Sequence, residues 1–203
     1  MAITSFGYLA FLAVALLFYY AIKPKWQTGY LLIVSLLFYG LSAQWYTILY
    51  LLASTVSVYY GALVIEKTTE QKKAKQVLTA VLCLNFGLLV LLKYYGFLLW
   101  NVNSIRALAG KEAVGISLQL TASLGISYYT LQLTGYLLDC YWRVGIVQKD
   151  FFRFALFAGY FPQMTSGPVS RYKQIQENLY EEHPFQYQQV THGLKRMAWG
   201  MFK

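Results

Sequence analysis

Long apolar runs are the feature that most restricts what this chain can fold into. A helix needs about 20 mostly apolar residues to cross the hydrocarbon core of a bilayer. Runs of about this kind cover 3–22, 26–41, 45–65, 77–92 and 116–141, and a shorter one covers 151–164. Because 58% of the 203 residues are hydrophobic and 12% are charged, a soluble domain would lack the polar surface that water requires. We predict an all-α, polytopic transmembrane helical bundle in which residues 1–203 form a single membrane domain, with no separate soluble domain.

The net charge of +9 fits a membrane protein better than a nucleic-acid-binding protein. Basic residues gather at the cytoplasmic ends of spans, and the chain has basic segments at 23–25 and 66–76. Two expected spans separate these segments, so they share the cytoplasmic side and the N-terminus lies outside. The link at 93–115 then lies outside although it carries three basic residues, and part of it is interpreted as an amphipathic helix on the membrane surface.

Two segments stand out within the apolar pattern. The run at 116–141 contains many small and hydroxylated residues, which indicates either a helix packed inside a bundle or one that lines a polar cavity. Asp139 near its end is either a boundary residue close to Arg143 or a site residue. The segment 161–171 contains two prolines and a glycine, which predicts a re-entrant segment or a helix-ending turn. Residues 174–189 are predicted as a loop, and an amphipathic helix begins at about 190.

Motifs for common chemistry are lacking. The sequence contains no GxGxxG, P-loop, HExxH or GxSxG pattern. Cys83 and Cys140 show no CxxC spacing and no neighbouring His cluster, so neither a disulfide nor a metal site is expected. His183 is expected to be solvated, and His192 lies on the final helix.

Two stretches near the centre of the chain resemble a known family. They read LGISYYTLQLTGYLLDCYW (124–142) and FRFALFAGYFPQMTSGPVSRYKQI (152–175). Upstream, SLLFYGLSAQWY (35–46) and LLKYYGFLLWNVNSI (91–105) agree with them. Over essentially its whole length the chain resembles the bacterial membrane-bound O-acyltransferases (the MBOAT family). The nearest members are of the alginate O-acetyltransferase type, and the teichoic-acid D-alanine transfer protein is a more distant relative.

The resemblance implies O-acylation of an extracytoplasmic polysaccharide or cell-wall polymer, as in alginate biosynthesis, with acetyl as the favoured acyl group. The family's general base is a His in a W-H-x-S segment of the second half of its chains. Neither His183 nor His192 matches that segment, so no catalytic residue is assigned. The chain therefore resembles the N-terminal half of such an enzyme, and alone it is expected to be inactive, whether it is a fragment, a truncated frame or a genuine short form.

Under this resemblance, the broken segment 161–171 is the candidate for contact with substrate. Irregular backbone at membrane depth must be buried in protein or line a cavity. The residues expected to line a substrate tunnel are Gln163, Ser166, Gly167, Pro168 and Arg171. No bound cofactor or metal is expected, and the acyl donor is left open between acetyl-CoA and another acyl carrier. The expected surroundings are the bilayer of the bacterial inner (plasma) membrane and envelope-polymer modification proteins, without nucleic acid.

Two other functions remain open on the sequence. A non-catalytic polytopic protein could serve as a transporter subunit or as a scaffold for acyl transfer. A small channel is the third hypothesis, but only the run at 116–141 is clearly polar, whereas a channel places polar residues in several spans.

Overall fold

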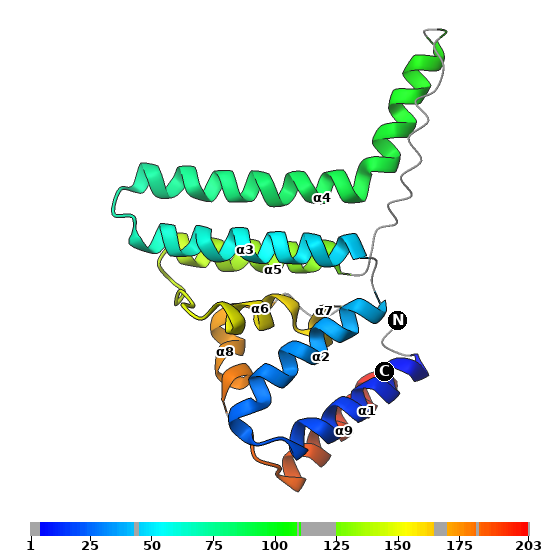
Figure 1. Ribbon diagram of the computed structural model, residues 1–203, viewed down its shortest axis with the longest axis vertical. Coiled ribbons are helices and arrows are strands. Elements are labelled where there is room, and N and C mark those ends of the chain that lie inside the picture. The colour runs from blue at the N-terminus through cyan, green and yellow to red at the C-terminus, as the bar shows by residue number, and fades with distance from the viewer. Residues whose placement is uncertain are drawn as a thin grey trace.

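The computed structural model describes residues 5–42, 45–108, 110, 125–164, 170–181 and 183–202, and every regular element in these ranges is helical (Figure 1). The elements are α1 (Phe6–Ala21), the 3-10 turn η1 (Pro24–Trp26), α2 (Gln27–Ser42), α3 (Trp45–Lys67), α4 (Gln71–Leu108), α5 (Ile126–Tyr141), α6 (Phe151–Gly159), α7 (Phe161–Met164), α8 (Tyr172–Tyr180) and α9 (Tyr187–Phe202). The predicted all-α fold is confirmed.

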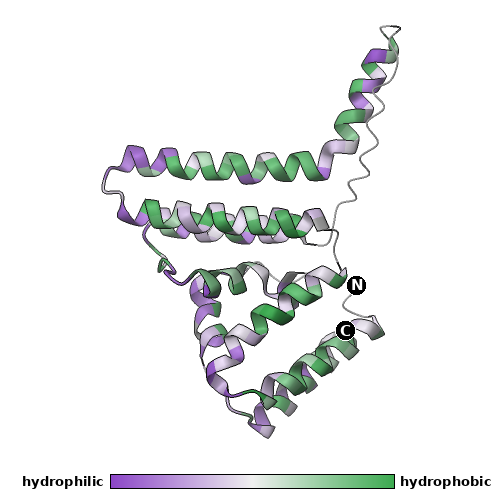
Figure 2. Cartoon of the chain, in the orientation of Figure 1, coloured by the Kyte–Doolittle hydropathy of each residue, from purple (hydrophilic) through white to green (hydrophobic). Residues whose placement is uncertain are grey.

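Two of these helices are long and apolar enough to cross a membrane. They are the 22-residue stretch Tyr46–Lys67 of α3 and the 38-residue α4, and α1 is a shorter apolar helix. Large apolar side chains such as Leu17, Ile33 and Leu91 are exposed, as lipid-facing residues would be. Figure 2 shows apolar residues along the middle of α3 and α4, and hydrophilic residues at the turn that joins them. These features are those of a membrane protein.

Helix α4 is longer at both ends than the predicted span at 77–92. The lysine-rich residues 71–76, predicted as part of a loop, form its first turns because Gln, Lys and Ala are strong helix formers. Its distal part bends away from the bundle in Figure 1. In that part, Asn101 Nδ2 and Ser104 Oγ donate to backbone carbonyls four residues earlier, so polar side chains are accommodated within a helix instead of ending it.

The C-terminal third also differs in part from the prediction. Helix α8 occupies half of the segment that was predicted as a loop at 174–189. Tyr172, Ile175 and Leu179 recur at helical spacing, and Tyr172 and Leu179 are buried, so this short helix forms because it can bury one face. The predicted final helix is present as α9. The predicted run at 116–141 is described from Gly125 onward, where α5 runs to Tyr141.

The main core is built by α3, α4 and α5, which run side by side in Figure 1, together with buried residues of α2, α6 and α8. Polar groups join these helices. The Tyr50 hydroxyl donates to the Asn85 carbonyl at 3.1 Å and lies 2.8 Å from Thr130 Oγ1, and Asn85 Nδ2 donates to Ser57 Oγ at 3.0 Å. The Thr130 hydroxyl of α5 therefore takes part in a packing contact with α3, as the first of the two interpretations of this polar sequence expects.

Candidate functional site

The first element of the candidate site is the start of α6, which the local sequence specifies. Asp150 is the N-cap residue, and its Oδ1 accepts from the backbone N–H groups of Phe152 at 2.8 Å and Arg153 at 3.3 Å. A carboxylate at this position satisfies amides that no helical carbonyl can reach. Gln148 Oε1 accepts from the N–H of Asp150 at 3.0 Å, so the turn before the helix is fixed as well.

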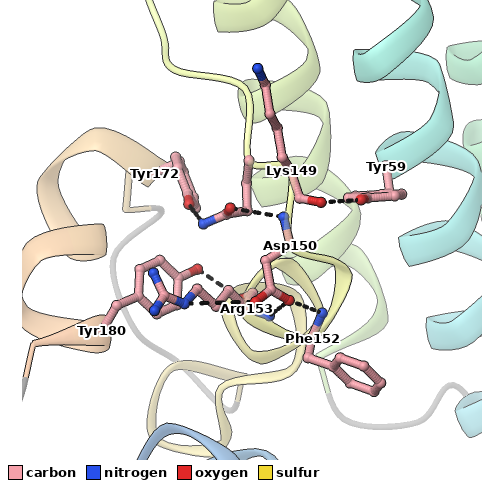
Figure 3. A network of polar contacts seen from close by, with 8 residues as sticks. Tyr59, Lys149, Asp150, Phe152, Arg153, Tyr172 and Tyr180 are labelled. Atoms are coloured by element: carbon pink, nitrogen blue, oxygen red, sulfur yellow. Dashed lines mark hydrogen bonds and ion pairs between the residues drawn. The ribbon is translucent and has the colours of Figure 1, made fainter.

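Hydrogen bonds join the start of α6 to α8 (Figure 3). Gln148 Nε2 donates to the Tyr172 hydroxyl at 2.7 Å, and the Tyr180 hydroxyl donates to the Arg153 carbonyl at 2.7 Å. The segment 149–171, which we call the re-entrant hairpin, therefore begins and ends at the same end of the helical bundle.

That end of the bundle is the one that carries the lysine-rich turn. The Tyr59 hydroxyl in the C-terminal half of α3 donates to the Lys149 carbonyl at 2.6 Å. The side chain of Arg143, just after α5, donates to the carbonyl of Thr68, just after α3, at 3.2 Å. The start of the re-entrant hairpin is thus held against the C-terminal half of α3, and the end of α5 against the α3–α4 turn.

The tip of the hairpin reaches the middle of α2. The N–H of Phe161 donates to Ser35 Oγ at 3.3 Å, and Ser35 lies midway along α2. The Phe161 ring is buried and contacts Phe11 and Phe38 edge-on or tilted. The helix breaks at Tyr160, between α6 and α7. Pro162, two residues later, has no backbone N–H with which to continue the hydrogen bonding of α6. The helix thus breaks beside α2. Residues 165–169 lie outside the described residues, and the choice between a re-entrant segment and a helix-ending turn stays open.

Two neighbouring cavities flank the break between α6 and α7. One has a volume of about 320 Å³ and lies between α1, Leu31 of α2, residues 160–162 and the end of α8. The other has a volume of about 220 Å³ and is lined by Tyr160, Gln163, Gln174, Ile175, Asn178 and Leu179. The two cavities share three lining residues, Tyr160, Asn178 and Leu179. Together they form an apolar recess with a few amide groups at its wall, the composition typical of sites for small organic groups.

His183 lines the larger cavity and is half-buried, in contrast to the prediction that it would be solvated. Its Nε2 lies 2.7 Å from the Asn178 carbonyl. Its backbone is held by Gln27, which accepts from the His183 N–H at 3.0 Å and donates to the His183 carbonyl at 3.0 Å. The imidazole is therefore fixed beside the cavity by its contacts with α2 and α8.

The residues predicted to line a tunnel are only partly placed together. Gln163 lines the smaller cavity, and its Oε1 is buried without a hydrogen-bond partner among the described residues. Arg171 is exposed, and its carbonyl accepts from the N–H of Gln174 in the first turn of α8. Ser166, Gly167 and Pro168 lie outside the described residues. A lining role for the five residues stays a prediction.

Local sequence patterns did not predict the other residues at this site. Gln27 follows a Lys-Pro-Lys turn and His183 precedes a proline, so each has the context of an ordinary linker. Asn178 lies in a segment that was predicted as a loop. Only the contact between α2 and the chain after α8 brings these residues together.

The aromatic hydroxyls at the base of the hairpin are held in their neutral form. Burial raises the pKa of Tyr172, and the Tyr180 and Gln148 side chains lower it in part. Burial raises the pKa of Tyr180 far above its usual value, the Tyr172 hydroxyl adds to the increase and Arg153 opposes it. Both hydroxyls are therefore neutral at neutral pH, where they form the hydrogen bonds described above. In the described part of the chain, no three His, Cys, Asp or Glu residues could hold a metal ion.

Several curated proteins are similar to this chain in sequence. The chain is 28% identical over 179 residues to a peptidoglycan O-acetyltransferase of Helicobacter pylori, a match that covers 75% of the chain. It is 26% identical over 190 residues to the "Probable alginate O-acetylase AlgI" of Pseudomonas aeruginosa, covering 94% of the chain, and 27% identical over 129 residues to that of Azotobacter vinelandii, covering 64%. No family model matches the chain.

The chain is a homologue of the membrane-bound O-acyltransferases. The expected relationship to the alginate O-acetylase type is confirmed by the match that covers almost the whole chain. This acyltransferase homologue spans about a third of the length of the curated relatives it matches, 33% of the H. pylori protein and 35% of the P. aeruginosa protein. The shared region is thus smaller than the half that the sequence resemblance suggested.

Proposed function

We propose that residues 1–203 form part of a membrane O-acetyltransferase that modifies hydroxyl groups of an extracytoplasmic polysaccharide or of peptidoglycan. The relatives carry the names of such enzymes. The structural observation that carries the proposal is the re-entrant hairpin. Its base is held by Gln148 and Tyr180, and Gln163 near its tip lines a cavity beside α8.

Gln163 has a specific role in this proposal. A buried amide oxygen without a donor costs about 1–3 kcal/mol, and the oxygen of Gln163 has no donor among the described residues. A substrate hydroxyl would supply the missing donor. We propose that Gln163 orients a hydroxyl or acyl group along the transfer path, and that Ser166, Gly167, Pro168 and Arg171 extend the same lining.

The remaining parts of the proposal concern topology and partners. The N-terminus lies outside, the turn between α3 and α4 lies in the cytoplasm, and several helices besides α3 and α4 cross the membrane. Residues 1–203 supply the scaffold and one wall of the path, and by themselves do not transfer an acyl group. Acetyl-CoA or another acyl carrier is the donor, and envelope-polymer modification proteins are the partners in the bacterial inner membrane.

Deletion of the gene tests this proposal. O-acetyl groups released by mild alkali would be measured separately from peptidoglycan and from extracellular polysaccharide. We expect one of the two polymers to lose its acetyl groups and the wild-type gene to restore them. Unchanged acetylation of both polymers would contradict the proposal.

Site variants separate a lining role from a scaffold role. Gln163→Leu should lower acetylation about tenfold at an equal amount of protein in the membrane, because a lost hydrogen bond of about 1.4 kcal/mol corresponds to that factor. Gln76→Leu, an exposed glutamine of α4, is the matched control and should restore full acetylation. Full acetylation by both variants would instead favour a scaffold that docks the transferase.

A further inference from the structure

A third cavity lies where α3 and α5 end and α4 begins. Its volume is about 520 Å³. The lining residues are Ile65, Thr68, Thr69, Gln71, Ala74, Tyr141, Trp142 and Arg143. We call this cavity the helix-end cleft. It is polar on the side of the α3–α4 turn and contains one cation, Arg143, among its lining residues.

Arg143 adopts the left-handed backbone conformation, which residues other than glycine rarely adopt. Its φ of 58° is the only positive φ of a non-glycine residue in the described part of the chain. This position follows α5, where glycine or asparagine is usual because a side chain strains the left-handed backbone. The Arg143 side chain crosses the cleft, and its guanidinium donates a hydrogen bond to the Thr68 carbonyl at 3.2 Å. That bond uses one of five N–H donors, so the group can bind an anion as well.

Further cations surround the helix-end cleft. Within 65–76 and 139–150 there are six basic side chains, Lys67, Lys72, Lys73, Lys75, Arg143 and Lys149, and four acidic ones, Glu66, Glu70, Asp139 and Asp150. Two of the acids are paired within their own turns, Glu70 with Lys73 at 3.0 Å and Asp150 with Arg153 at 3.8 Å. Lys72 and Lys75 are exposed and line a neighbouring groove on α4. The balance at this end favours a ligand with negative charge.

The surroundings indicate an amphiphilic ligand and not a free anion. Trp142, Val144 and Ile146 follow α5 next to the cleft, and each is about 60% exposed. Tryptophan is enriched where hydrocarbon meets the headgroup layer. Basic pockets between helices on the cytoplasmic side are suited to acidic lipid headgroups. A headgroup phosphate could lie in the cleft while its acyl chains follow these apolar side chains.

We infer that the helix-end cleft binds the phosphate of an acidic phospholipid, with Arg143 as the central donor and Lys72 and Lys75 as supporting cations. The inference depends on the membrane location of the chain and not on acyl transfer. Its test therefore has a readout independent of the proposed function.

The test measures phospholipid retained by the purified full-length protein in detergent, by native mass spectrometry. Phosphatidylglycerol and phosphatidylcholine of equal chain length would compete, and inorganic phosphate would be added separately. We expect phosphatidylglycerol to be retained preferentially, and phosphate at millimolar concentration not to displace it. Equal retention of the two lipids would overturn the inference. Displacement by phosphate would assign the cleft to a free anion and would also overturn it.

Arg143→Gly is the most informative variant, because it removes the cation and also relieves the backbone strain. It should weaken phosphatidylglycerol binding about fivefold, the effect of one basic residue near an anionic surface, while thermal stability is unchanged or higher. Arg143→Lys should retain most of the affinity. The double variant Lys72→Gln with Lys75→Gln, at two exposed positions, should also weaken binding.

Lys25→Gln is the matched control, because Lys25 is exposed and lies in the other basic segment. It should leave phosphatidylglycerol binding within about twofold of the wild type. An equal loss in Lys25→Gln and Arg143→Gly would indicate general attraction by positive charge and would contradict a specific cleft.

Discussion

At the residue scale, Gln27 shows how one buried amide can organise distant parts of this chain. Its side chain is 3% exposed and makes two hydrogen bonds of 3.0 Å with the backbone of His183. The side-chain amide thereby supplies partners for the backbone N–H and carbonyl of His183, which lies between α8 and α9. This contact fixes the chain after α8 against the start of α2 and so closes one side of the larger cavity.

Replacement of Gln27 should therefore destabilise the fold. Gln27→Leu leaves the N–H and carbonyl of His183 without their partner, which should cost about 1–3 kcal/mol in the free energy of unfolding. Thermal unfolding of the detergent-solubilised protein would measure the change. The exposed Gln76→Leu serves as control and should stay within about 0.5 kcal/mol. Equal melting temperatures for both variants would contradict this role of Gln27.

The buried hydroxyl of Tyr180 should make the stability of the fold depend on pH in the alkaline range. In an unfolded chain its hydroxyl ionises near pH 10, whereas burial raises its pKa in the folded protein. The folded state therefore holds more protons than the unfolded state above pH 10, and stability falls as pH rises through this value. Tyr180→Phe should show a smaller loss between pH 9 and 11, as measured by thermal unfolding. An unchanged pH profile would show that other groups cause the alkaline loss.

At the scale of elements, close approach of α3 and α4 depends on Gly61. A Cβ built at this position would lie 2.9 Å from Val81 Cγ2 and 3.6 Å from Leu137 Cδ1. Small residues permit such close helix contacts in membrane proteins. Gly29 of α2, in contrast, has no atom within 4 Å of such a Cβ.

Alanine substitutions at these glycines should therefore have opposite effects. Gly61→Ala should destabilise the bundle by about 1–3 kcal/mol through overpacking, and adding Val81→Ala should recover part of the loss. Gly29→Ala should be neutral or stabilise by up to about 1 kcal/mol, because alanine favours helices. Thermal unfolding of the wild type, the three single variants (Gly61→Ala, Val81→Ala and Gly29→Ala) and the double variant would show this coupling. Additive effects of Gly61→Ala and Val81→Ala would indicate that the two residues do not contact each other.

The elements also show where sequence patterns predict structure and where they fail. The apolar runs located α1, α2 and α3 to within a few residues, because a long run with this composition has few alternatives to a helix. They missed the helical residues 71–76 and 172–180, and at 94–108 a helix was expected for only part of the link. In each of these segments the residues are polar or mixed in character, and helix formation depends on propensity or on burial of a narrow face that hydropathy alone does not reveal.

At the scale of the whole molecule, the re-entrant hairpin predicts which residues share a side of the membrane. Lys149 and Arg171 flank the hairpin, and Leu108 at the end of α4 lies on the side proposed to be outside. Leu108 is 91% exposed, so a cysteine there would be accessible to a reagent.

Cysteine labelling would test this arrangement in a protein whose Cys83 and Cys140 are replaced by serine. A membrane-impermeant maleimide should modify Lys149→Cys and Arg171→Cys only from the cytoplasmic side. It should modify Leu108→Cys only from the outside. Labelling of positions 149 and 171 from opposite sides would contradict the re-entrant arrangement, and labelling of position 108 from the cytoplasm would contradict the proposed orientation.

The sequence by itself determined the class of this protein: helical, membrane-embedded and related to O-acyltransferases. Those properties depend on composition, on apolar runs and on local motifs, which are read directly along the chain. It also singled out 161–171 as a broken segment, because prolines interrupt helices wherever they occur.

Only the tertiary structure decided how the candidate site is built. Residues 149 and 171 lie at the same end of the bundle because Gln148 binds Tyr172. One wall of the larger cavity forms because Gln27 binds the backbone of His183. These contacts join residues 24 and 156 positions apart. A polar side chain carries no local sign of a partner so distant, because the partner is set by how the helices pack and not by the neighbouring sequence.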